Sequence, residues 1–163
     1  MPDLVVQQLF SYSDDRYFSL FIKRTRARTL IDMQITAGIY NTRDLPATYR
    51  LLVKFLPNVL KSKCFNNDKI PFSREVQETE IGHLFEHILL EYLCELKIAK
   101  GYEDVTYSGT TDWNWYRNPR GSFHVDIDSG IADSDIFPLA LEKSMLLLKR
   151  IMIGSCKSVR IPS

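Results

Sequence analysis

The chain has 163 residues, of which 45% are hydrophobic and 12% aromatic. This size and composition are typical of one folded domain with a sizeable core, and they exclude a disordered chain. The 21 basic and 20 acidic residues leave a net charge of +1, which gives no reason to expect nucleic acid or an anionic membrane as a partner. We therefore expect a single domain over residues 1–163.

The start of the chain and its cysteines predict a cytoplasmic protein. Met1-Pro2-Asp3-Leu4 is not the basic stretch followed by an apolar run that begins a signal peptide. No stretch approaches the roughly 18–20 apolar residues of a membrane span. Cys64, Cys94 and Cys156 form no Cys-x-x-Cys pair, so we expect reduced thiols rather than disulfides or a cysteine-rich zinc site.

The first third of the chain favours strands. Residues 4–10 are β-prone, and residues 29–36 alternate between polar and apolar side chains, which predicts a strand with one buried face. Residues 14–24 fit a helix and a strand equally well. Asp44 and the proline two residues later predict the start of a helix that reaches about residue 60 and is bent or ended by Pro57.

The rest of the chain reads as a loop, a long helix, two strands and a last helix. The expected ranges are 61–72 for the loop, 73–100 for the helix, 105–107 and 122–128 for the strands, and 133–153 for the last helix. Strands and helices are grouped rather than alternating. This order predicts an α+β fold, with helices packed on a largely antiparallel sheet.

The long predicted helix carries the sequence His83-x-x-Glu86-His87. Two histidines four residues apart lie one turn apart on the same side of a helix, so both imidazoles can bind one metal ion. Glu86 directly precedes the second histidine and can take a proton from a bound water, as in the inverted form of the zinc-peptidase motif. Because the apolar side chains lie on the opposite side, we expect the pair to face solvent or a cleft, and two plain surface histidines are the alternative.

A zinc site needs further ligands. Glu91 lies about 12 Å along the helix from His83, so we expect it to orient His87 rather than to bind the ion. The third ligand is expected from the C-terminal half, where four side chains qualify: His124, Asp126, Asp128 and Glu142. The pattern does not choose among them, and Asp128 is the working assignment beside His83 and His87.

This helix resembles one in the N-terminal domain of cyanophycin synthetases, ligases that build an aspartate-arginine polymer. The residues that carry the resemblance are Gly82-His83-x-x-Glu86-His87-x-x-x-Glu91, with looser matches at Leu56-Pro57, Cys64 and Gly121-x-Phe123-x-Val125. The similarity covers roughly residues 50–150. It implies an α+β domain with a peptidase-like metal site that hydrolyses peptide or isopeptide material.

The chain departs from that family pattern at two places. Ser62 stands where the family has a histidine, and Tyr107-Ser108-Gly109-Thr110-Thr111 stands where it has Phe-Gly-Arg-Thr-Arg, so both arginines are missing. The same polymer is therefore not carried over as the substrate. Because the chain ends before any ATP-binding ligase domain, we do not expect it to act as a synthetase by itself.

Two functions follow from these observations. The first is a small zinc-dependent hydrolase of peptide or isopeptide bonds, in which Glu86 is the catalytic base and the partner is a peptide-like substrate. The alternative is a non-catalytic binding or assembly module that shares the fold of the synthetase domain. A homo-oligomer is compatible with either function, and metal content distinguishes the two.

Overall fold

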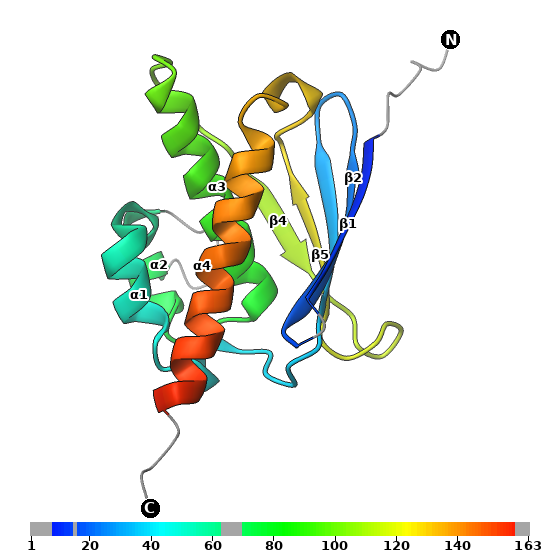
Figure 1. The fold of residues 1–163 in the computed structure, drawn as a ribbon, viewed down its shortest axis with the longest axis vertical. Coiled ribbons are helices and arrows are strands. Elements are labelled where there is room, and N and C mark those ends of the chain that lie inside the picture. Colours follow the sequence, from blue (N-terminus) through cyan, green and yellow to red (C-terminus); the bar gives the residue numbers. More distant parts are fainter. Residues whose placement is uncertain (1–7, 15, 63–69, 159–163) are drawn as a thin grey trace, which may run out of the picture.

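The computed structural model describes residues 8–14, 16–62 and 70–158. Within these ranges, five strands form one sheet and four α-helices pack on one face of it (Figure 1). The strands are β1 (Gln8–Asp14), β2 (Phe18–Arg24), β3 (Thr29–Ile35), β4 (Gly109–Asp112) and β5 (Ser122–Ile127). The α-helices are α1 (Thr48–Phe55), α2 (Phe72–Glu75), α3 (Ile81–Ala99) and α4 (Phe137–Ser158), and short 3-10 helices are η1 (Thr42–Asp44), η2 (Pro57–Lys61) and η3 (Ile131–Asp133).

The strand order in the sheet is β1-β2-β3-β5-β4, and every neighbouring pair is antiparallel. This confirms the predicted α+β fold with an antiparallel sheet. The alternation predicted for residues 29–36 is also present, because Ile31 and Met33 are buried against the helices whereas Leu30 and Asp32 are exposed on the other face.

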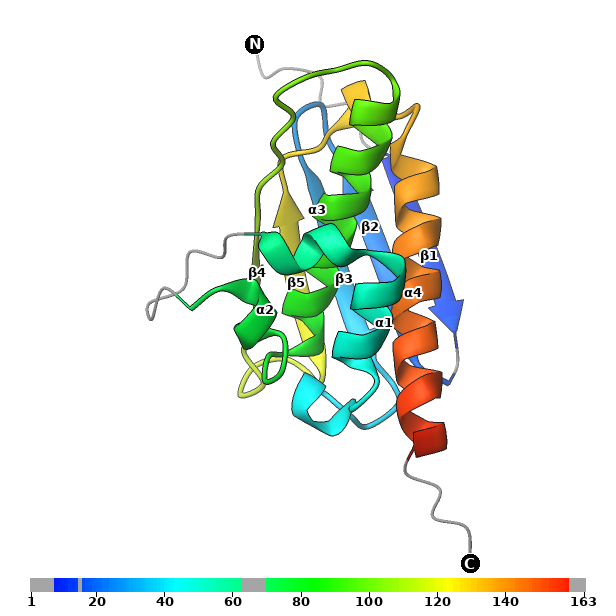
Figure 2. The ribbon, with the colours of Figure 1, turned by 90° about the vertical axis from the view of Figure 1, so that its left-hand side faces the viewer.

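The helices form two layers over the sheet. Figures 1 and 2 show α3 and α4 lying against the sheet, with α1 and α2 on the far side of these two helices. Helix α3 contacts β4 and β5 on one side and η2 on the other. It is therefore enclosed on both sides, which explains why most residues of its first three turns are buried.

Gly82 allows the first turn of α3 to approach the sheet closely. A Cβ atom at this position would lie 2.3 Å from Cγ of Phe123, a buried residue of β5. Such a distance is far shorter than van der Waals contact, so any side chain here would push α3 away from β5. The position of the next residue, His83, thus depends on this glycine.

Two predicted helices are each divided in the structure. The predicted helix from Asp44 to about residue 60 becomes η1, α1 and η2, and α1 is separated from η2 at Pro57, which lacks the N–H that a continuous helix would need. The predicted helix 73–100 becomes α2 and α3, separated by residues 76–80. Helix α3 then ends at Ala99 with Lys100 as its C-cap, followed by Gly101 with a positive φ of 96°, as a helix C-terminus favours.

The strand predicted at residues 105–107 is wrong. The strand that pairs with β5 is β4, which begins two residues later at Gly109. The hydroxyl of Tyr107 instead donates a hydrogen bond to Asp133, 3.1 Å away, so this segment is held by a side chain rather than by the sheet. The strand predicted at residues 4–10 begins at Gln8 in the structure, and its first residues lie outside the described part of the chain.

Two further expectations concern the membrane and the cysteines. No helix in the described ranges combines the length and the apolar character that crossing a bilayer requires. Cys94 and Cys156 are free thiols, as predicted, and Cys64 lies outside the described residues.

The close approach at Gly82 makes a testable prediction. In most helices a glycine-to-alanine change stabilises the fold by about 0.5–1 kcal/mol. Here Gly82→Ala should lower the free energy of unfolding by about 1–3 kcal/mol, since the new methyl group overlaps Phe123. Urea denaturation measures the difference. Gly154→Ala in α4 is the matched control, because its Cβ would meet Ala47 only at 3.3 Å, and a Gly82→Ala protein as stable as wild type would contradict the packing described.

Candidate metal centre

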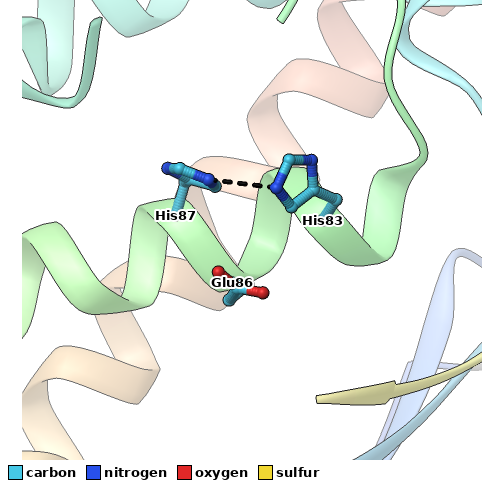
Figure 3. Close-up of side chains that lie close together, drawn as sticks. All are labelled: His83, Glu86 and His87. Carbon is cyan, nitrogen blue, oxygen red and sulfur yellow. Dashed lines mark hydrogen bonds between the residues drawn. The ribbon is translucent and has the colours of Figure 1, made fainter. Parts of the chain in front are cut away.

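Helix α3 brings His83, Glu86 and His87 together. One ligand atom from each side chain lies within 4.8 Å of the others. Figure 3 shows the two imidazole rings facing each other across one turn of the helix, with a hydrogen bond of 3.1 Å between their Nε2 atoms. The predicted pairing of the two histidines on one side of the helix is therefore present in the structure.

The geometry of this group fits a zinc ion. Zinc binds imidazole nitrogens at about 2.0–2.1 Å with tetrahedral angles, which places two bound nitrogens about 3.3 Å apart. The two Nε2 atoms of His83 and His87 are already 3.1 Å apart, so little movement is needed for both to bind one ion. Two imidazoles and a carboxylate are also the ligand types that zinc prefers.

The group is buried beneath the outer layer of helices. The side chain of Glu86 is 4% exposed and that of His87 is 6% exposed. The ring of His87 stacks on Phe72 of α2, with ring centres 3.8 Å apart and planes inclined by 10°. The alternative of two plain surface histidines is therefore wrong, because α2 and η2 cover the side of α3 that the sequence suggested was open.

The other ring nitrogen of each histidine contacts a hydroxyl group. Nδ1 of His87 lies 3.0 Å from Oγ of Ser62, and Nδ1 of His83 lies 2.9 Å from Oγ1 of Thr79. The carboxylate of Glu75, at the end of α2, lies 3.7 Å from the same nitrogen of His83. Partners of this kind fix the orientation of metal-binding histidines in proteins.

Glu86 points toward β4, where the hydroxyl of Thr111 donates a hydrogen bond of 2.7 Å to its Oε1. Gly109 allows this approach, since a Cβ there would lie 2.8 Å from Ile127 and 3.4 Å from Cγ of Glu86. Burial raises the pKa of Glu86 above the ordinary value, and the nearby Glu75 carboxylate raises it further, whereas Thr111 and His83 lower it.

His87 is a neutral imidazole at physiological pH. Burial lowers its pKa to about 3, and the neighbouring His83 contributes to the same shift. A neutral imidazole already has a nitrogen lone pair available for a metal ion, whereas a protonated ring must first lose a proton. The burial of His87 thus prepares it as a ligand.

His124 and Asp126 are not brought to the group. Along β5 the apolar residues face the helices, so these two residues face away from α3. His124 contacts Asp32 at 2.6 Å, and Asp126 forms an ion pair with Arg28 at 2.7 Å. Both are therefore part of the outer face of the sheet.

The remaining predicted residues are Glu91, Asp128 and Glu142. Asp128 accepts hydrogen bonds from the backbone N–H and the hydroxyl of Ser108, at 2.9 and 3.0 Å. Glu142 is exposed on α4. Glu91 is half-buried, and burial together with Glu95 raises its pKa, but both ring nitrogens of His87 are contacted by other residues. Asp128 as third ligand and Glu91 as orienting residue stay predictions.

Sequence reasoning missed four residues of the site: Ser62, Glu75, Thr79 and Thr111. Thr79 lies four residues before His83, directly before α3, whereas the other three come from segments that only the fold brings to α3. A signal existed for two of them, because Ser62 and Thr111 stand where the resembling family has a histidine and an arginine.

The low pKa of His87 predicts a pH dependence of stability in the metal-free protein. In the unfolded chain His87 takes up a proton near pH 6.5, whereas in the fold it does so only near pH 3. The contribution of neutral His87 to the free energy of unfolding is fully present above pH 6.5 and is lost as the pH falls toward 3. From pH 7 to 5, wild type should lose about 2 kcal/mol more than His87→Phe, a variant that keeps a ring beside Phe72.

The measurement is urea denaturation at several pH values in the presence of a chelator. Glu86, whose raised pKa acts in the opposite direction, is present in both proteins and largely cancels in the comparison. Parallel stability curves for the two proteins would show that folding does not lower the pKa of His87.

Comparison with known protein families places the site in context. The sequence model of the Cyanophycin synthase-like N-terminal domain matches residues 30–125, more than half of the chain. The matched range runs from β3 into β5 and contains His83, Glu86 and His87, whereas Asp128 and Glu142 lie beyond it. A search of curated proteins finds no match to this chain. The chain belongs to the cyanophycin synthase-like N-terminal domain family, and it carries a His/Glu/His group that can hold a metal ion.

Proposed function

We propose that the protein is a zinc-dependent hydrolase of peptide or isopeptide bonds that acts on a peptide-like substrate in the cytoplasm. The observation that carries the proposal is the convergence of the Nε2 atoms of His83 and His87 beside the carboxylate of Glu86. Membership of the cyanophycin synthase-like family supports it, because that family resemblance implies a peptidase-like site on the same helix.

His83 and His87 hold the ion through their Nε2 atoms in this proposal. Zinc bound there would polarise the carbonyl of the scissile bond and lower the pKa of a coordinated water. The carboxylates of Glu75 and Glu86 lie beside the histidine pair, and His87 is neutral, so negative charge near the pair favours a divalent cation over an empty site.

Glu86 acts as the base. Thr111 binds one of its carboxylate oxygens, so the second oxygen is the one that accepts a proton from the attacking water. A direct zinc ligand would lie about 3.3 Å from the other ligand atoms, and a separation of up to 4.8 Å leaves room for a water molecule beside the carboxylate. As this water attacks the carbonyl carbon, Glu86 takes its proton and then returns it to the leaving nitrogen.

Zinc sites that catalyse hydrolysis use three protein ligands, so the proposed site needs one more besides His83 and His87. Asp128 remains the assignment made from the sequence, although it is bound to Ser108 in the structure. Glu75 lies 3.7 Å from Nδ1 of His83, the nitrogen on the opposite side of the ring from the one that would hold the ion, so it is placed to orient the ring rather than to complete the set.

One observation favours the alternative, a binding or assembly module without catalysis. Glu86 and His87 are almost fully buried, which restricts the access of a substrate to the ion. Two hollows lie on the opposite face of the sheet, and both are lined by Asp32 and His124. In such a module a metal at His83 and His87 would join α3 to its neighbours rather than react.

The first prediction of the proposal concerns metal content. After loading with zinc and desalting, the protein should retain about one ion per chain, and the double variant His83→Ala, His87→Ala should retain far less. Elemental analysis measures both. His124→Ala is the matched control, because it removes the third histidine of the chain at a site on the other face of the sheet.

Zinc far below one equivalent in wild type, with no change in the double variant, would reject the site. Asp128→Asn extends the same measurement to the third ligand. Loss of zinc in this variant supports Asp128 in that role, and a variant that keeps full zinc would exclude it.

The second prediction concerns catalysis. Glu86→Gln keeps the size of the side chain and its acceptor oxygen for Thr111 but cannot take up a proton at neutral pH. It should leave zinc content nearly unchanged and reduce hydrolysis by about a hundredfold or more, the range expected for losing a general base. The assay should include aspartate-arginine polymer and short acidic peptides, since the arginines after Tyr107 are missing.

Glu95→Gln is the matched control, because Glu95 is an exposed glutamate on the same helix. Equal rates for wild type and Glu86→Gln would reject Glu86 as the base. If zinc-loaded wild type cleaves nothing across a broad panel of peptides, the binding module becomes the better assignment.

A further inference from the structure

The hydrogen bonds around the two histidines determine which ring nitrogen carries the proton. A serine hydroxyl has one hydrogen to donate. Ser62 donates it to the backbone oxygen of Val59, 2.7 Å away. Toward His87 the same hydroxyl can therefore only accept, so the proton of the neutral His87 ring lies on Nδ1. Its Nε2 is then bare and directed at His83.

The bare nitrogen of His87 fixes the state of His83 in the absence of metal. The two Nε2 atoms are 3.1 Å apart, a hydrogen-bond distance, and two bare nitrogens would repel each other there. The proton between them must then belong to Nε2 of His83. Nδ1 of that ring accepts a hydrogen bond, and the hydroxyl of Thr79 donates it over 2.9 Å.

Binding of an ion requires both Nε2 atoms to be bare, so His83 must change its tautomer. The hydroxyl of Thr79 can rotate from donor to acceptor, which lets Nδ1 of His83 carry the proton instead. The carboxylate of Glu75, 3.7 Å from that nitrogen, favours a proton there. His87 needs no such change.

We infer that the two histidines are unequal: Ser62 presets His87 as a metal ligand, whereas Thr79 lets His83 switch tautomer when the metal binds. Ser62 and Thr79 are positioning residues that act through the rings. The inference concerns the site on which the proposed function rests, but it makes a statement about the metal-free protein that does not require hydrolysis.

The test is NMR spectroscopy of protein labelled with nitrogen-15 at histidine, recorded at pH 8, where imidazoles are ordinarily neutral. Without metal, His87 should show a protonated Nδ1 and a bare Nε2, and His83 the reverse. After zinc loading, both rings should show a protonated Nδ1. A metal-free His87 with its proton on Nε2 would overturn the inference, whatever the activity of the protein.

Two variants test the role of Ser62. Ser62→Ala should leave His87 as a mixture of tautomers and weaken zinc binding by about 10–100-fold in a chelator competition, the usual effect of removing such a partner. Ser62→Thr keeps the hydroxyl and should restore both properties. An unchanged tautomer and unchanged affinity in Ser62→Ala would reject Ser62 as the positioning residue.

Ser122→Ala is the matched control. Its hydroxyl also donates to a backbone oxygen three residues earlier, at 2.6 Å from Pro119, but no histidine accompanies that bond. Tautomers and zinc affinity should therefore equal those of wild type. If wild type shows the expected tautomers with and without zinc but cleaves no peptide, the proposed function fails while the inference stands. If zinc-loaded wild type cleaves peptides but metal-free His87 carries its proton on Nε2, the inference fails while the proposed function stands.

Discussion

Within two turns of α3, Glu86 and His87 are almost fully buried and His83 is partly buried, and the structure around these ionisable side chains has to compensate for the loss of water. A buried polar group without a hydrogen-bond partner costs up to several kcal/mol, so each of the three needs a partner from elsewhere in the chain. Ser62 follows η2, Thr79 precedes α3, and Thr111 lies on β4. The site thereby connects the outer layer of helices, the central helix and the edge of the sheet.

The other end of α3 is held by a second buried carboxylate. Asp133 in η3 accepts hydrogen bonds from Lys97 near the end of α3, from Tyr107 in the loop that follows, and from Ser129. Tyr107 lies four residues before Thr111, so the chain is attached to Asp133 just before it enters β4. The hydrogen bond of Tyr107 to Asp133 and that of Thr111 to Glu86 therefore hold this segment against α3. The position of the Glu86 carboxylate thus depends on contacts at both ends of the helix.

Local sequence patterns predicted the structural features that depend on residues close together in the chain. The alternation around Ile31 predicted β3, and the four-residue spacing of His83 and His87 predicted their pairing. Partners from distant segments were not predictable, because no spacing relates Ser62 to α3. Asp126 and His124 as candidate ligands, however, conflict with the period of two already present in β5, where the alternate residues are apolar and face the helices.

The departures of this chain from the resembling family pattern are concentrated on the site. Ser62 contacts His87, Thr111 binds Glu86, and Gly109 lies against the stem of Glu86. An arginine at position 109 could not be placed with β4 at its present distance, since even a Cβ would lie 2.9 Å from the backbone oxygen of Asp126. A guanidinium beside Glu86 would also favour its charged form, whereas with a neutral threonine burial remains the largest effect on its pKa. The chain thus retains the histidine pair but gives the neighbouring carboxylate a less positive environment, which makes that carboxylate a stronger proton acceptor.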